Sequence, residues 1–265
     1  MAPKIISQGN TAEIFEYDDG RVVKLYRSGL VDALCQHEYT VGCKVYAKTK
    51  MCPQVFEIVR IDGRSGIVFE KIDGPTMLKR IYKNIWLLKS ESRKMGQYHI
   101  AVHQEIDGLT SVKDKLTTDI QAVEALTKKE KAILIDYLTT LPDGNALCHF
   151  DFHPDNIMYK YGSPVIIDWM TACSGDALSD VARTGIILKY AVVPRVPSLV
   201  AKVISLFQNK VYEYYLKEYL RLSNCKIENV KRWELPIMAA RLREWVSDEE
   251  KAVLLTLVRQ KITAF

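Results

Sequence analysis

The sequence lacks the features that place a protein in or across a membrane. It has no run of about 18 apolar residues, and its start, Met-Ala-Pro-Lys, has no apolar core of a signal peptide. Its cysteines form no Cys-x-x-Cys pair and show no zinc-ligand spacing; they are Cys35, Cys43, Cys52, Cys148, Cys173 and Cys225. These absences predict a reduced, cytoplasmic protein that binds no membrane.

Charge of one sign is not concentrated anywhere along the chain. The 37 basic and 32 acidic residues give a net charge of +5 and form no long block of like charges. No basic patch with interleaved aromatic residues is present, so we expect no nucleic-acid partner. The mild positive charge suits an anionic ligand such as a nucleotide, but by itself it identifies none.

The hydrophobic pattern changes once, near Gly74. Before it the chain favours strands, with turns at 18–20 and 62–64 and one helix over about 31–48. After it the pattern favours helices, except for three short strand-like runs within 146–168. Residues 76–106 and 112–140 are expected to be mostly helical, and further helices are expected at about 176–191, 197–223, 235–246 and 248–263. The sequence therefore predicts a two-lobed α+β protein, with a β-rich lobe over 1–73 and a helical lobe over 74–265.

The strongest chemical signal is HFDFHPDN at 149–156, followed by VIID at 165–168. Phosphoryl transfer needs a carboxylate to orient the attacking hydroxyl and oxygen ligands to hold Mg²⁺ on the phosphates. Asp151 fits the first role, while Asn156 and Asp168 supply the hard oxygen atoms that Mg²⁺ prefers. A loop whose Asp and Asn side chains merely cap turns is the alternative. The apolar strand that ends in Asp168 favours the catalytic interpretation.

Lys24 lies inside the apolar run from Val22 to Tyr26, where an unpaired lysine should not point inward. Glu38 follows on the expected helix and is a plausible partner. Together they match the strand lysine and helix glutamate that clamp nucleotide phosphates in kinases; a solvent-facing Lys24 is the alternative.

The segment Gly9, Asn10 and Thr11 could turn and offer backbone N–H groups to phosphate. It lacks the GxGxxG set, and an ordinary hairpin turn explains it about as well.

The chain resembles the aminoglycoside phosphotransferase-like family, relatives of the protein kinases that phosphorylate small molecules. The resemblance covers nearly the whole length and rests on GNTAEIFEYDDGRVVKLY, QHEY, GIVFEKIDGPTM, HFDFHPDNIM, IIDW and GDALSDVAR. It implies a bilobal protein-kinase-like fold and an ATP- or GTP-dependent kinase that uses Mg²⁺.

By this resemblance, each candidate residue takes a role. Asp151 would be the catalytic base, Asn156 and Asp168 the metal ligands, and Lys24 with Glu38 the phosphate clamp. Backbone groups from Glu70 to Ile72, at the hinge between the lobes, would receive the nucleotide base. Phe150 departs from the family pattern, which has glycine or another small residue there.

Two other functions share these motifs. A protein kinase would need an activation segment, but only eleven residues separate Asp168 from Asp180 and no Ala-Pro-Glu follows. A nucleotide-binding regulatory protein of the same fold would have little need for the complete catalytic set. We therefore expect a hydroxyl acceptor of low molecular weight: an aminoglycoside-like antibiotic, a choline-like alcohol, a sugar or an amino alcohol.

Three further groups have weaker signals. Asp180 could accept backbone N–H bonds from the catalytic loop, or simply suit the helix start. His99 and His103 have a spacing that could bind metal, but no HExxH pattern surrounds them and a structural role is favoured. A cationic acceptor could be attracted by acidic residues near the carboxyl end, although Ser247 to Glu250 also forms a capping box. These acidic residues are Glu234, Glu244, Asp248, Glu249 and Glu250.

Overall fold

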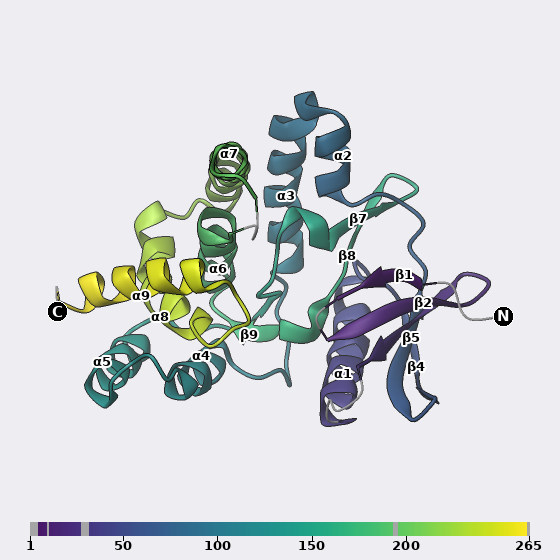
Figure 1. Ribbon diagram of the computed structural model, residues 1–265, viewed down its shortest axis with the longest axis horizontal. Coiled ribbons are helices and arrows are strands. Elements are labelled where there is room, and N and C mark those ends of the chain that lie inside the picture. The colour runs from purple at the N-terminus through teal and green to yellow at the C-terminus, as the bar shows by residue number, and fades with distance from the viewer. Residues whose placement is uncertain (1–4, 10, 28–31, 193–195, 264–265) are drawn as a thin grey trace. The chain divides into compact units, whose positions relative to one another are not determined.

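The computed structural model describes residues 5–9, 11–27, 32–192 and 196–263 (Figure 1). The chain divides into two compact units, each assembled from two separate stretches. The first unit comprises Met1–Arg80 and Asp155–Thr171, and the second comprises Ile81–Pro154 and Ala172–Phe265. The predicted lobes, 1–73 and 74–265, stay a prediction about domains. The two units differ from them in two ways: the first stretch of the first unit runs on to Arg80, and residues 155–171 also belong to the first unit.

The first unit is built on a five-stranded antiparallel sheet with the order β1-β2-β3-β5-β4. Helix α1 packs on this sheet (Figure 1). Its Cys35 joins Ala12, Tyr26 and Ile67 in a buried apolar cluster. Burial of these side chains on one face is what fixes the helix against the sheet. The elements are β1 (Ile5–Gln8), β2 (Ala12–Asp18), β3 (Arg21–Tyr26), α1 (Asp32–Thr49), β4 (Val55–Ile61) and β5 (Arg64–Glu70).

The later stretch of the first unit is a hairpin of β7 (Ile157–Lys160) and β8 (Ser163–Ile166), followed by the 3₁₀ turn η3 (Trp169–Thr171). Its backbone is bonded to the earlier stretch, because the Ile166 N–H donates to the Met51 carbonyl at 2.6 Å. The Thr76 hydroxyl also donates to Asp155 at 2.7 Å. These bonds, from residues far apart in sequence, explain why the hairpin belongs to this unit.

The second unit is helical, with one small two-stranded sheet. Helix α6 is its most buried element: every residue from Leu178 to Leu188 is buried, and α7 and α8 pack against it. Helix α3 packs along α7. The elements are η1 (Ile85–Leu87), α3 (Leu88–Val102), α4 (Val112–Ala122), α5 (Lys128–Thr139), β6 (Ala146–Cys148), β9 (Cys173–Gly175), α6 (Ala177–Tyr190), α7 (Ser198–Ser223), α8 (Ile227–Arg241) and α9 (Asp248–Ile262). Helix α2 (Met77–Lys83) and the 3₁₀ turn η2 (Pro154–Asn156) cross the boundaries between the units.

The α+β class is confirmed, and most element positions agree with the sequence prediction. The stretches 76–106 and 112–140 are mostly helical, as expected, and each is divided into separate helices. In the first stretch, the Asn84 side chain accepts the Trp86 N–H and forms a separate start after α2. The helix expected at 235–246 begins at Ile227 instead. Proline is common in the first turn of helices, but here Pro236 lies inside α8. Strand β9 falls just beyond the expected strand region of 146–168.

Among the residues that the structure describes, no helix combines the length and the apolar character needed to cross a membrane.

Candidate active site

In the first unit, strand β3 directs two polar side chains to one carboxylate. Lys24 and Tyr26 are two residues apart, so they share a face of the strand. The Lys24 ammonium lies 2.7 Å from Glu38 Oε1, and the Tyr26 hydroxyl donates to Glu38 Oε2. Glu38 is buried on α1, with only 4% of its side chain exposed. The ion pair expected between Lys24 and Glu38 is therefore present, and Tyr26 is a third member that sequence analysis missed.

Lys24 also contacts the candidate metal ligand Asp168, with 3.2 Å between Nζ and Oδ1. Burial of the ammonium opposes its charge, but the two carboxylates outweigh this and raise the pKa of Lys24 above its ordinary value. The same carboxylate of Glu38, together with burial, raises the pKa of Tyr26. Lys24 is thus a fixed cation and Tyr26 a fixed hydrogen-bond donor.

The β7–β8 hairpin brings Asn156 close to the residues before Asp168. Ile157 pairs with Ile166, and the Ile167 N–H donates to the Asn156 carbonyl at 2.9 Å. Asp168 has a φ of 62°, a left-handed conformation that is uncommon for a residue with a side chain. Its carboxylate is 45% exposed, whereas Asn156 is buried. An amide oxygen and a carboxylate near a fixed cation form a donor set that fits Mg²⁺.

The other predicted nucleotide-binding residues lie at the ends of strands. Gly9 and Thr11 form the turn between β1 and β2, and the Gly9 N–H donates to the Ala12 carbonyl at 2.8 Å. This amide is therefore engaged within the turn; Asn10 lies outside the described residues. Glu70 ends β5 and forms an ion pair with Lys160, while Ile72 is half-buried just beyond the strand.

Asp151 belongs to the second unit, on the loop that follows β6. Its carboxylate is 33% exposed and lies 3.7 Å from His153 Nε2. Burial of the carboxyl disfavours its charged form, but His153 and the positive field of Arg183 outweigh this, so the pKa of Asp151 is held below its usual range. The Asp151 N–H donates to His149 Nδ1 at 3.2 Å. The loop therefore presents an ionised carboxylate that is partly open to solvent.

The backbone before Asp151 is held from helix α6. Phe150 has a φ of 64°, the left-handed conformation that glycine adopts freely, so this loop keeps the backbone shape although the residue is not glycine. Its N–H donates to Asp180 Oδ1 at 2.9 Å, and its carbonyl accepts from Arg183 Nε at 3.1 Å. The expected contact of Asp180 with the catalytic loop is present, and Arg183 is a second anchor that sequence analysis left without a role.

Three of the five acidic residues that could attract a cationic acceptor are engaged with cations of the chain itself. Glu244 makes a two-pronged ion pair with Arg183, at 2.7 and 2.8 Å, and a further contact with Arg241 at 2.9 Å. Glu250 also pairs with Arg241, and Glu234 pairs with Lys189 and Lys261. Asp248 and Glu249 are exposed in the first turn of α9, which Ser247 caps.

The structure thus joins Lys24, Glu38 and Asp168 directly, ties Asn156 to them through the hairpin backbone, and places Asp151 in the other unit. Tyr26 could have been found from its spacing, because it lies two residues after Lys24 on a strand. Arg183 carried no such signal, since its partners lie 33 and 61 positions away.

Comparison with known proteins gives a family and a fold. The family model described as "phosphotransferase enzyme family" matches residues 4–213. A search of the curated proteins found no match in sequence.

Among solved structures, a choline/ethanolamine kinase family protein from Mesorhizobium loti is similar with a TM-score of 0.60 and 13% identity, over 99% of this chain and 92% of that one. APH(2″)-IIa, in a ternary complex with streptomycin and ATP, has a TM-score of 0.59 and 16% identity, over 98% and 91%. The macrolide 2′-phosphotransferase MphH from Brachybacterium faecium has a TM-score of 0.53 and 15% identity, over 98% of this chain and 90% of that one. The chain shares the fold of these proteins, which confirms the predicted protein-kinase-like class.

Proposed function

This chain belongs to the phosphotransferase enzyme family, and on that premise we propose that it transfers the γ-phosphate of ATP or GTP to a hydroxyl group of a small molecule. The observation that carries the proposal is the contact of Lys24 with both Glu38 and Asp168. A lysine held by a buried glutamate is suited to bind nucleotide phosphates as a compact positive charge. Its second contact puts a candidate metal ligand beside those phosphates.

In the proposed mechanism each residue has a separate task. Asn156 and Asp168 would hold Mg²⁺, which supplies charge neutralisation on the phosphates when it is bound. Asp151 would accept a hydrogen bond from the acceptor hydroxyl and align it for attack. It would take the hydroxyl proton as the new oxygen–phosphorus bond forms and the bond from the γ-phosphorus to the departing nucleoside diphosphate breaks. The lowered pKa of Asp151 keeps the carboxylate ionised in the neutral range, so it can accept the hydrogen bond that aligns the hydroxyl; the same shift makes it a weaker base.

The donor nucleotide would lie along the first unit. The turn at Gly9, Asn10 and Thr11 is proposed to cover its phosphates, and backbone groups from Glu70 to Ile72 are proposed to bind its base. The turn would use amides other than that of Gly9, which the Ala12 carbonyl already engages.

A small acceptor is supported by the short path between Asp168 and Asp180. This interval holds only the turn η3, the strand β9 and the beginning of α6. No segment long enough to support a protein substrate lies in it, which disfavours the protein-kinase alternative.

The charge of the acceptor can be proposed from the acidic residues of the second unit. Glu234, Glu244 and Glu250 each have a partner among the chain's own Lys and Arg residues. A carboxylate already neutralised by a guanidinium attracts a further cation weakly. We therefore expect neutral hydroxyl compounds to be better acceptors than polycationic ones.

The first experiment is a screen for acceptor-stimulated release of ADP or GDP, with aminoglycosides, amino alcohols, choline-like alcohols and neutral sugars as candidates. Nucleotide hydrolysis without acceptor supplies the background. Release stimulated by a hydroxyl compound, with the phosphate found on that compound, supports the proposal. No stimulation by any class, together with no nucleotide binding, would leave a regulatory protein as the better interpretation.

Three variants separate the roles. Asp151→Asn should leave Mg-nucleotide binding nearly intact while turnover falls by about 10² to 10⁴, or roughly 3 to 5 kcal/mol in the barrier. Asp168→Asn should weaken metal-dependent nucleotide binding as well as turnover, and Lys24→Ala should weaken nucleotide use strongly. Calorimetric titration with a non-hydrolysable nucleotide, with and without Mg²⁺, measures the binding.

Two surface variants serve as matched controls. Asp143→Asn removes a carboxylate that is 89% exposed, and Lys48→Ala removes an exposed lysine of α1. Both should leave binding and turnover unchanged. Loss of Mg-nucleotide binding in Asp151→Asn, with binding preserved in Asp168→Asn, would reverse the two assignments.

A further inference from the structure

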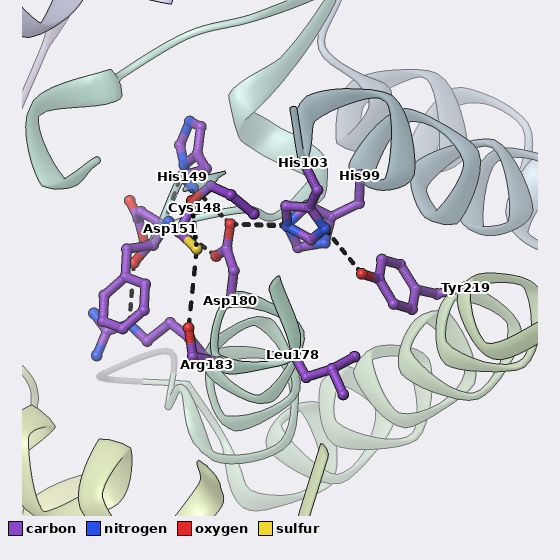
Figure 2. A network of polar contacts seen from close by, with 12 residues as sticks. His99, His103, Cys148, His149, Asp151, Leu178, Asp180, Arg183 and Tyr219 are labelled. Atoms are coloured by element: carbon purple, nitrogen blue, oxygen red, sulfur yellow. Dashed lines mark hydrogen bonds and ion pairs between the residues drawn. The ribbon is translucent and has the colours of Figure 1, made fainter. Parts of the chain in front are cut away.

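In the second unit, two histidines at the end of α3, His99 within the helix and His103 directly after it, face two tyrosines of α7. His99 and His103 are one helical turn apart, and so are Tyr215 and Tyr219. His99 Nδ1 lies 2.6 Å from the Tyr215 hydroxyl, and His103 Nδ1 lies 2.9 Å from the Tyr219 hydroxyl. The other ring nitrogens both approach the carboxylate of Asp180 (Figure 2).

The carboxylate of Asp180 is fully buried and collects four donors. His99 Nε2 lies 3.0 Å and His103 Nε2 3.4 Å from Oδ2. The backbone N–H of His149 donates to the same oxygen at 2.5 Å, and that of Phe150 donates to Oδ1 at 2.9 Å. Burial opposes the charge of Asp180, but the two histidines outweigh it and lower its pKa, so the group is an acceptor only.

The protons of this cluster can be assigned from the chemistry of its members. An ionised carboxylate can only accept, so both Nε2 atoms must carry the proton. Burial lowers the pKa of His99 to about 4, so this ring is neutral and its Nδ1 has a lone pair that can accept a hydrogen bond. Burial raises the pKa values of Tyr215 and Tyr219, so their hydroxyls stay protonated and donate hydrogen bonds to the two Nδ1 atoms.

The consequence for the loop follows from the two backbone bonds. His149 and Phe150 directly precede Asp151, and the left-handed backbone of Phe150 is held by the same carboxylate. Without the imidazoles, the Asp180 carboxylate could rotate about its Cβ–Cγ bond and accept hydrogen bonds from other donors. The two histidines limit this rotation. The two tyrosines donate to Nδ1 of each ring and so keep the ring proton on Nε2, where it faces Asp180.

We propose that His99 and His103 are positioning residues for phosphoryl transfer: held in one tautomer by Tyr215 and Tyr219, they orient the Asp180 carboxylate, which fixes the backbone that presents Asp151. The proposal rests on the proposed function, because it assumes that Asp151 acts on the acceptor. None of the four side chains is assigned a contact with substrate.

A metal ion is the competing occupant of the same cluster. Ligand atoms of His99, His103 and Asp180 lie within 4.8 Å of one another. A zinc ion would need a deprotonated Nε2 on both rings. The proton of each ring would then be on Nδ1, and the tyrosine hydroxyls would accept hydrogen bonds from it. The backbone N–H of His149, only 2.5 Å from Oδ2, favours the hydrogen-bonded arrangement, because it already occupies the oxygen that both rings approach.

The direct test is a long-range ¹H–¹⁵N spectrum of the histidine rings in the whole protein between pH 5 and 8. We expect His99 to be neutral with the proton on Nε2, and Tyr215→Phe to release His99 into a mixture of tautomers. Tyr137→Phe is the matched control, because it removes another hydroxyl bond of this unit, 3.0 Å long, from α5. Mixed tautomers in the wild type would overturn the proposal, as would one zinc ion per chain in the purified protein.

The kinetic test compares Leu and Gln at each histidine, since a Gln amide N–H can replace Nε2–H. The Leu variants should lower kcat by about ten- to a hundredfold with the KM for nucleotide unchanged, and the Gln variants should recover most of it. A lower melting temperature with unchanged kcat in the Leu variants would reduce the residues to a purely structural role. If the wild type itself transfers no phosphate, the proposed function fails; if it does and the Leu variants match it, only the present proposal fails.

Discussion

Phe150 offers a sharp test of the loop that carries Asp151, because two opposing effects act at one position. Its φ of 64° is strained for any residue with a Cβ, and its side chain is only 2% exposed. Phe150→Gly and Phe150→Ala both remove the buried ring. Only the glycine variant also removes the conformational strain, so the comparison of the two variants isolates the backbone contribution.

The magnitude follows from two general costs. Loss of a buried phenylalanine side chain destabilises a protein by about 3 to 5 kcal/mol, and this is shared by both variants. At an ordinary position glycine is less stable than alanine by about 0.5 to 1 kcal/mol, because its unfolded chain has more freedom. A left-handed conformation costs alanine about 1 to 2 kcal/mol. The balance makes Phe150→Gly more stable than Phe150→Ala by about 0.5 to 1 kcal/mol.

Phe152 is the internal control, because it lies in the same loop, is completely buried, and has no positive φ. There the order should be the ordinary one, with alanine more stable than glycine. Urea unfolding of the four variants gives the free energies of unfolding. If alanine is the more stable residue at both positions, Phe150 is not strained and the reasoning about its anchors at Asp180 and Arg183 is wrong.

Three further predictions concern other parts of the chain. Tyr26→Phe should raise the KM for nucleotide about tenfold in steady-state kinetics, because Glu38 loses a hydrogen bond to a charged group worth about 1.5 kcal/mol. His99 has a pKa of about 4 when folded and about 6.5 when unfolded, so the unfolded chain binds the extra proton between these values and stability falls as the pH drops. Between pH 7.5 and 5 the free energy of unfolding should fall by about 2 kcal/mol less in His99→Gln than in the wild type, as urea unfolding would measure. Gly74→Ala would place a Cβ 1.8 Å from a carbonyl oxygen of β7 and should cost about 3 kcal/mol in the same assay, whereas Gly20→Ala, with no atom within 4 Å, should cost about 1 kcal/mol for its φ of 81°.

Local patterns predicted most of the fold. The alternation in β2 and β3 and the turn at Gly20 are encoded by neighbouring residues, so the hairpin was foreseen. Errors arose where tertiary packing overrides local preference. Helix α8 continues through Pro236 because its residues from Leu235 to Arg241 are buried against other helices. The break at Asn84 depends on one side-chain bond, which hydrophobic spacing does not report.

The candidate site divides in the same way. Asp151, Asn156 and Asp168 were found because their motif is contiguous or nearly so. The contact of Lys24 with Glu38 was expected from spacing, but its contact with Asp168 joins residues 144 positions apart. The tyrosines of α7 meet the histidines of α3 across 116 positions, and no period in either helix identifies the partner. Sequence reasoning therefore named the candidate reactive groups and missed the residues that hold them in place.

Residues 155–171 belong to the first unit although they follow residues of the second unit in the sequence, and this limits where the chain can be cut into fragments. A fragment that ended at Arg80 would carry Lys24 and Glu38 but not Asp168, the second carboxylate that stabilises the Lys24 ammonium. It would also leave the Thr76 hydroxyl without Asp155 and Glu70 without Lys160. The first unit is therefore not encoded by one continuous stretch of the gene. A truncation at the end of the amino-terminal sheet, or an exchange of this sheet between relatives, would separate Lys24 from Asp168, one of its two carboxylate partners. A fragment that can be moved to another protein would have to include both stretches of the first unit.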